Sequence, residues 1–170
     1  GGTRYEAARE KHLAQLSEQY RQTVADDLQG PRTRLKRYAM GVARAKLGDT
    51  ADKMAIERRA AEIERSIVED PALRTRYVEG SFDRYLNTIM SSTHDRATQE
   101  EQRTGKSGVA AQLAAMRTKA FTSEDQADID AYNKLFDSSY RRPAEDAFLD
   151  SHRVPHVRPV NNRADGLTEK

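Results

Sequence analysis

The side chains best suited to binding a ligand lie in one stretch, from Pro31 to Gly48. It contains no acid and six cations: Arg32, Arg34, Lys36, Arg37, Arg44 and Lys46. Apolar residues recur between the cations at helical spacing, so one face of a helix can pack while its flanks stay positive. Such a flank is suited to contacting phosphates. The same cations can instead pair with carboxylates on a neighbouring helix, and both interpretations stay open.

A second candidate for phosphate chemistry is the sequence Thr104-Gly105-Lys106-Ser107, which resembles the end of a P-loop. The full pattern requires a glycine five residues before Gly105, where this chain has Glu100. It also requires a preceding strand, and none is predicted here. We therefore interpret this stretch as a flexible loop.

Other arrangements that could support catalysis are missing. His152 and His156 have the spacing of two metal ligands on one helix face, but Pro155 between them prevents that helical register. Paired acids such as Asp26-Asp27 are adjacent, so they point to different sides of a helix and are interpreted as caps or solubilising charge. The chain has no cysteine, which excludes thiolate catalysis and cysteine-based metal sites. The sequence predicts no catalytic residue, no metal site, no cofactor and no enzymatic activity.

The C-terminal residues 151–170 contain prolines and are predicted to be extended. An extended segment of this kind can act as a docking peptide, because it loses little conformational freedom when it enters a groove. A disordered chain end is the alternative. The candidate docking residues are Arg153, Val154, Val157, Arg158 and Val160.

The elements that position these residues are predicted to be helices throughout. Apolar residues step by three or four along 4–29, 31–48, 49–68 and 71–90. Glycine and proline separate these stretches, with Pro31 suited to a first helical turn and Gly48 to the residue after a helix. Asp49 or Thr50 can cap the third helix, and Asp70 with Pro71 can begin the fourth. Gly80 marks a break within the fourth.

Residues 91–108 have no apolar side chain larger than alanine, which favours a polar linker or a solvated helical extension. A short amphipathic helix is predicted to follow, capped by Ser107 or Gly108. Thr122 and Asp125 then have the spacing of a capping box, and the helix that they begin is expected to stop before Pro143. The predicted organisation is an all-α, elongated helical bundle (1–90), a polar linker (91–108), a smaller helical pair (109–150) and an extended tail (151–170).

Composition sets bounds on function. Charged residues make up 33% of the chain and apolar residues 36%, which leaves enough apolar surface for a thin core. The net charge is only +2, so any preference for a polyanion must come from a local patch. No apolar run approaches the roughly 18–20 residues that span a bilayer, so no membrane insertion is predicted. The chain begins without methionine, which is consistent with a processed or excised fragment.

These observations favour a non-catalytic helical module for interaction with protein partners or for self-assembly. It would belong to a larger complex, such as a phage or mobile-element machine, or to a longer protein. The alternative is a nucleic-acid-binding protein that contacts phosphates through the basic helix. A further alternative is a translocated effector with an arginine-bearing C-terminal signal. The expected location is the cytoplasm or a macromolecular assembly.

Overall fold

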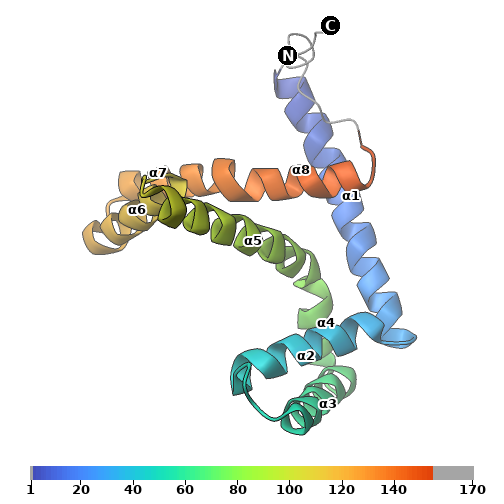
Figure 1. Cartoon of the computed structure of the whole chain (residues 1–170). Helices are drawn as coiled ribbons and strands as arrows, with labels where there is room; N and C mark the ends of the chain where they lie inside the picture. Colours follow the sequence, from blue (N-terminus) through green and yellow to red (C-terminus); the bar gives the residue numbers. More distant parts are fainter. Residues whose placement is uncertain (1, 155–170) are drawn as a thin grey trace, which may run out of the picture. The chain divides into compact units, whose positions relative to one another are not determined.

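The computed structural model describes residues 2–154, with side chains from residue 4, and confirms the predicted all-α class. These residues form helices joined by short links, and no strand occurs among them (Figure 1). In chain order the elements are α1 (Gly2–Gln29), α2 (Thr33–Leu47), α3 (Lys53–Glu69), α4 (Pro71–Glu79), α5 (Ser81–Thr104), α6 (Val109–Ser123), α7 (Gln126–Phe136), the π-helical segment η1 (Asp137–Arg141) and α8 (Arg142–Ser151).

The described chain forms two compact units. The middle unit is Gln15–Arg84, and the terminal unit consists of the other described residues, 2–14 and 85–154. Helices α1 and α5 each contribute residues to both units. The division predicted at 91–108 partitions the chain differently and stays a prediction. Most of that stretch continues α5, which is the helical alternative left open for it.

Several predicted helix ends are confirmed in the middle unit. Gly48 follows α2 with φ 92°, a backbone conformation that favours glycine, and its N–H bonds to the last turn of the helix. Asp70 caps α4, because its carboxylate accepts the N–H of Ala72 at 2.9 Å. Pro71 is the first residue of that helix, and Gly80 separates α4 from α5.

The start of α2 differs from the prediction, because its cap comes from another helix. Pro31 lies in the turn before α2 and not in its first helical turn. Carboxylate oxygens of Asp27, near the end of α1, accept the N–H groups of Arg34 and Leu35, each at 3.1 Å. These bonds satisfy donors that a helix N-terminus otherwise leaves open. The interpretation of Asp27 as a capping residue is confirmed.

The same arrangement recurs at the start of α6. The carboxylate of Glu101, near the end of α5, accepts the N–H of Ala110 at 2.9 Å and that of Ala111 at 3.2 Å. Gly108, one of the two predicted caps, occupies the N-cap position. A Cβ atom at Gly108 would lie 3.0 Å from a Glu101 oxygen, so glycine allows the carboxylate to approach.

Two further cap predictions are wrong. Neither Asp49 nor Thr50 caps α3, because the chain first makes a turn closed by the N–H of Ala51 and the carbonyl of Gly48 at 3.2 Å. The helix begins later, with Asp52 at the N-cap position.

The predicted capping box at Thr122 and Asp125 does not form. Helix α6 continues through Ser123, and the Thr122 hydroxyl donates to the carbonyl of Thr118 at 2.8 Å within it. Asp125 is itself the N-cap of α7 and accepts the N–H of Ala127 at 3.0 Å.

The helix that begins with α7 does not stop before Pro143, contrary to prediction. It passes through η1 into α8 with helical backbone angles at each junction, and Pro143 lies in the first turn of α8 (Figure 1). Apolar residues spaced four apart drift by about 40° per step around an α-helix. The wider π turn compensates for this drift, so that Phe136, Tyr140, Ala144 and Phe148 all contribute to packing in the terminal unit.

The core of the middle unit joins α1, α2, α3 and α4. One cluster contains Val24, Leu28, Leu35, Ile67 and Tyr77. A second cluster lies between α2 and α3, and three of its four buried members are alanines, which allow the two helices to approach closely. Helices α2 and α3 pack antiparallel, because Leu35 near the start of α2 shares a cluster with Ile67 near the end of α3, and Ala43 shares the other with Ile56.

Tyr77 and its aromatic neighbour Tyr38 hold an arginine in the middle unit. The guanidinium of Arg84 lies 4.8 Å from the ring centroid of Tyr77 and 4.8 Å from that of Tyr38. It also donates to the Tyr77 carbonyl. Burial raises the pKa of the Tyr77 hydroxyl to about 12, although the charge of Arg84 opposes that shift.

We expect the raised pKa of Tyr77 to make the middle unit sensitive to alkali. The folded state holds the phenolic proton more tightly than the unfolded state does, so its stabilisation is complete below about pH 10. The stabilisation is then lost as the pH rises toward 12, at a cost of about 2 kcal/mol. Urea unfolding at a series of pH values should show this loss in the wild type and less of it in Tyr77→Phe. Tyr132→Phe, in the terminal unit, is the control and should retain the loss.

Candidate functional site

The structure places the six cations of the basic stretch in two groups. Arg32 and Lys36 lie beside α3, where their side-chain nitrogens are 3.9 and 3.4 Å from a Glu64 oxygen. Of the two interpretations left open for the basic stretch, these two cations therefore fit pairing with a carboxylate on a neighbouring helix. The other four cations are exposed and form no ion pair with a described residue: Arg34, Arg37, Arg44 and Lys46.

Three of the exposed cations share the outward side of α2. Leu35, Ala39 and Ala43 are buried on the inward side. At 100° per residue, Arg34, Arg37 and Arg44 fall on the opposite side of the helix. We call these three the arginine face.

The predicted tail begins later than expected, because α8 extends to Ser151. Arg153 then adopts φ 58°, and the N–H of Val154 bonds to the carbonyl of Leu149 at 3.1 Å. This pattern is a Schellman motif, which closes the helix C-terminus. Val154 is half-buried and Arg153 is exposed, whereas Val157, Arg158 and Val160 lie outside the described residues.

The structure does not bring the residues of the P-loop-like stretch or of the histidine pair together into a site. Thr104 ends α5, and Lys106 lies in the link to α6 with its N–H bonded to the Thr104 hydroxyl, so a helix and not a strand precedes this stretch. His152 packs on the end of α8, with its ring centroid 4.5 Å from that of Phe148 and Nδ1 2.9 Å from the Phe148 carbonyl. His156 lies outside the described residues.

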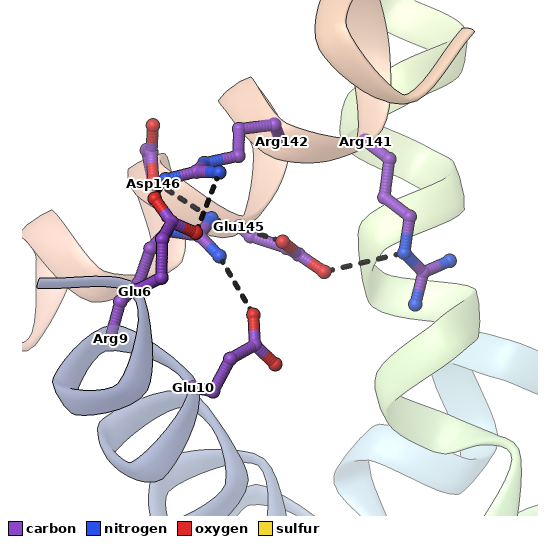
Figure 2. Close-up of polar contacts among 7 residues, drawn as sticks. All are labelled: Glu6, Arg9, Glu10, Arg141, Arg142, Glu145 and Asp146. Atoms are coloured by element: carbon purple, nitrogen blue, oxygen red, sulfur yellow. Dashed lines mark hydrogen bonds and ion pairs between the residues drawn. The ribbon is translucent and has the colours of Figure 1, made fainter. Parts of the chain in front are cut away.

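A charge cluster around a buried arginine, which sequence reasoning missed, joins α1 to α8 in the terminal unit. The Arg9 side chain is only 1% exposed. Its Nε and Nη2 lie 3.1 and 2.9 Å from Asp146, and Nη2 lies 3.0 Å from Glu145. Arg142 reaches back to Glu6 with two bonds of 2.7 and 3.0 Å. Figure 2 shows the side chains of α1 and α8 pointing toward one another across this junction.

The charges of this cluster stabilise the contact between α1 and α8, because the pKa values of both arginines are raised. Burial alone would lower the pKa of the Arg9 guanidinium, but hydrogen bonds to Asp146 and Glu145 outweigh it and raise the pKa. Hydrogen bonding to Glu6 likewise raises the pKa of Arg142, against the effect of burial. Both cations therefore stay charged and paired. The carboxylates accept bonds from arginine, which holds α1 on α8.

The terminal unit also contains an apolar groove of about 880 Å³. Helices α5 and α6 form two of its sides, and α7 with η1 forms the third. The lining residues are mainly aliphatic and aromatic: Asn87, Met90, Ser91, His94 and Asp95 from α5, Ala110, Leu113, Ala114, Arg117, Thr118 and Phe121 from α6, and Tyr132, Phe136 and Tyr140 from the third side.

Two aromatic side chains that line the groove, Tyr140 and Phe121, lie in different surroundings. At one position the Tyr140 hydroxyl lies 3.2 Å from His94 Nδ1, and burial raises the pKa of Tyr140. At the other, Phe121 is 70% exposed, and the Arg117 guanidinium lies 5.2 Å from its ring centroid. A large aromatic ring left in water at the edge of an apolar groove is typical of a binding surface.

Sequence reasoning missed the groove because its residues lie on three helices that the pattern treated separately. Leu113, Phe136 and Tyr140 have the helical spacing of ordinary packing residues. One signal was available in Phe121, a phenylalanine outside the apolar stripe of its helix. The π-helical segment, which places Tyr140 in the groove, has no clear sequence signature; such segments frequently occur at functional sites.

Comparison with protein-family models, with curated proteins and with solved structures found no match to this chain. The groove and the arginine face are therefore the two features from which we infer function. None of the helices within residues 2–154 combines the length and apolar character needed to cross a lipid bilayer.

Proposed function

We propose that the chain is a non-catalytic helical interaction module, which binds an amphipathic helix of a partner protein in the groove of its terminal unit. The observation that carries the proposal is Phe121, 70% exposed on the rim of an apolar groove. Aromatic side chains of this kind are frequent anchors of protein interfaces, because they bury a large area at small entropic cost. The module would act as one component of a larger complex.

The dimensions and the rim of the groove favour a helix as its occupant. The lining positions of α6 run from Ala110 to Phe121, about 17 Å along the helix axis, which matches three turns of a bound helix. Asp95 lies on the α5 side and Arg117 on the α6 side. A partner helix with a basic residue along one edge and an acidic residue along the other complements these charges.

A peptide-binding experiment tests this proposal. The probes are 14-residue amphipathic helical peptides selected by display, each carrying one tryptophan on its apolar face. Because the chain itself has no tryptophan, the emission comes from the peptide alone. We expect burial in the groove to shift this emission to shorter wavelength, with a Kd that rises about tenfold or more in Phe121→Ala, since loss of an interface anchor costs about 2 kcal/mol.

A matched pair of variants locates the binding site. Ala114 lines the groove, whereas its exposed neighbour Ala115 does not. Ala114→Arg should block the peptide, and Ala115→Arg should leave its affinity unchanged. If no selected peptide distinguishes the two variants, the groove is not the binding site and the proposal is wrong.

A further inference from the structure

We infer that the arginine face of α2 binds the phosphate backbone of double-stranded nucleic acid. This inference concerns the middle unit and does not depend on the groove. It starts from three guanidinium groups, Arg34, Arg37 and Arg44, on the outward side of one helix. Guanidinium groups bind phosphate oxygens through two parallel hydrogen bonds, and the major groove of duplex DNA is wide enough to admit a helix.

The charges of this face are not used inside the described structure. Arg37 and Arg44 make no ion pair or side-chain hydrogen bond with any residue from 4 to 154. Arg34 lies with its guanidinium 5.5 Å from the ring centroid of Tyr20, which holds the cation over an aromatic ring without neutralising it. In contrast, Arg32 at the N-cap position of α2 and Lys36 within that helix lie beside Glu64. The three arginines are therefore available to an external anion.

A glycine in the middle of this face gives independent support. Gly41 lies four residues after Arg37 and three before Arg44, so it shares their side of the helix. Its φ is not positive, and an added Cβ would meet nothing within 4 Å. Neither the backbone nor the packing requires glycine here, although glycine weakens a helix interior. Close approach of a ligand between the two arginines accounts for it.

The first test measures binding of a fluorescein-labelled 20-base-pair DNA duplex by anisotropy at several salt concentrations. Neutralising three phosphates should weaken binding about 40-fold between about 50 mM and 200 mM salt. The triple variant Arg34→Ala/Arg37→Ala/Arg44→Ala should lose binding together with this salt dependence.

The matched control removes three exposed arginines of the same unit that lie on other helices. Arg58→Ala/Arg65→Ala/Arg76→Ala changes the net charge equally and should retain most of the affinity. Absence of duplex binding even at the lowest salt would overturn the inference, and so would equal loss in both triple variants. Stronger binding of a polyglutamate peptide than of the duplex would identify an acidic protein as the ligand, and would also overturn it.

Gly41→Ala gives a second test in which stability and binding move in opposite directions. Alanine should raise the thermal midpoint, because it is the better helix former and has free space. The added methyl group should at the same time raise the Kd for the duplex about threefold or more, since it separates the helix from the phosphates. A stabilised variant that binds with unchanged affinity would contradict close approach at this face.

Discussion

Arg9→Ala is expected to lower the free energy of unfolding by about 2–3 kcal/mol, because the half-buried carboxylates of Asp146 and Glu145 lose their hydrogen bonds to a buried cation. The Arg9 side chain is 1% exposed and provides two of its nitrogens to Asp146 and one of these also to Glu145. Removing it takes away these three hydrogen bonds and a fourth, from Nη1 to Glu10 at 3.3 Å, and opens space between α1 and α8. Urea unfolding followed by circular dichroism measures the loss.

The control for this prediction is on the same helix. Arg4 is exposed and makes no ion pair with the other described residues, so Arg4→Ala should change the unfolding free energy by less than about 0.5 kcal/mol. A double-mutant cycle with Asp146→Ala should give a coupling of about 1–3 kcal/mol, since the two residues are in direct contact. If Arg9→Ala is no more harmful than Arg4→Ala, the junction does not stabilise the fold.

Arg9 shows which parts of the charge cluster can be predicted from the spacing of apolar residues and which cannot. The predicted apolar stripe of the first helix runs through Leu13, Tyr20 and Val24, and extending it back by one step arrives at Arg9. The pattern therefore contains a signal that position 9 faces inward. It contains no signal for the partners, because Glu145 and Asp146 lie more than 130 residues away in a chain in which a third of the residues are charged.

Local rules predicted several helix ends that a single turn decides, but they did not predict which helix a side chain from another helix would cap. Gly48, Asp70 and Gly80 act within their own turns, and these ends were predicted correctly. Asp27 and Glu101 cap helices that begin six and eight residues later, which depends on how the chain folds back. The groove is the same kind of feature on a larger scale, since it exists only after α5, α6 and α7 pack.

The prediction that a helix ends before Pro143 is wrong for a different reason. Proline removes a hydrogen-bond donor and is normally a reason to end a helix. Here it follows directly after η1, where the bonding pattern already changes from one type of turn to another. The cost of proline is smallest in the first turn of a helical segment, and the π-to-α transition provides such a position without interrupting the rod.

Phe148→Ala is the second prediction with a large effect, a loss of about 3–5 kcal/mol in unfolding free energy. Phe148 is 1% exposed, and its ring centroid lies 5.7 Å from that of Tyr85 and 4.5 Å from that of His152. Truncation leaves a cavity between α5 and α8 and removes both ring contacts. Urea unfolding monitored by circular dichroism measures the effect, and Phe148→Leu should recover part of the loss because it fills much of the cavity.

Phe121→Ala is the matched control, because it makes the same chemical change at a side chain that is 70% exposed. It should alter the unfolding free energy by less than about 0.5 kcal/mol, since its ring is already in contact with water. The same variant is expected to lose peptide affinity, so that one phenylalanine contributes to stability and the other to binding. If Phe121→Ala destabilises the fold as much as Phe148→Ala does, its ring is part of the core, and the groove loses the anchor on which the proposed function depends.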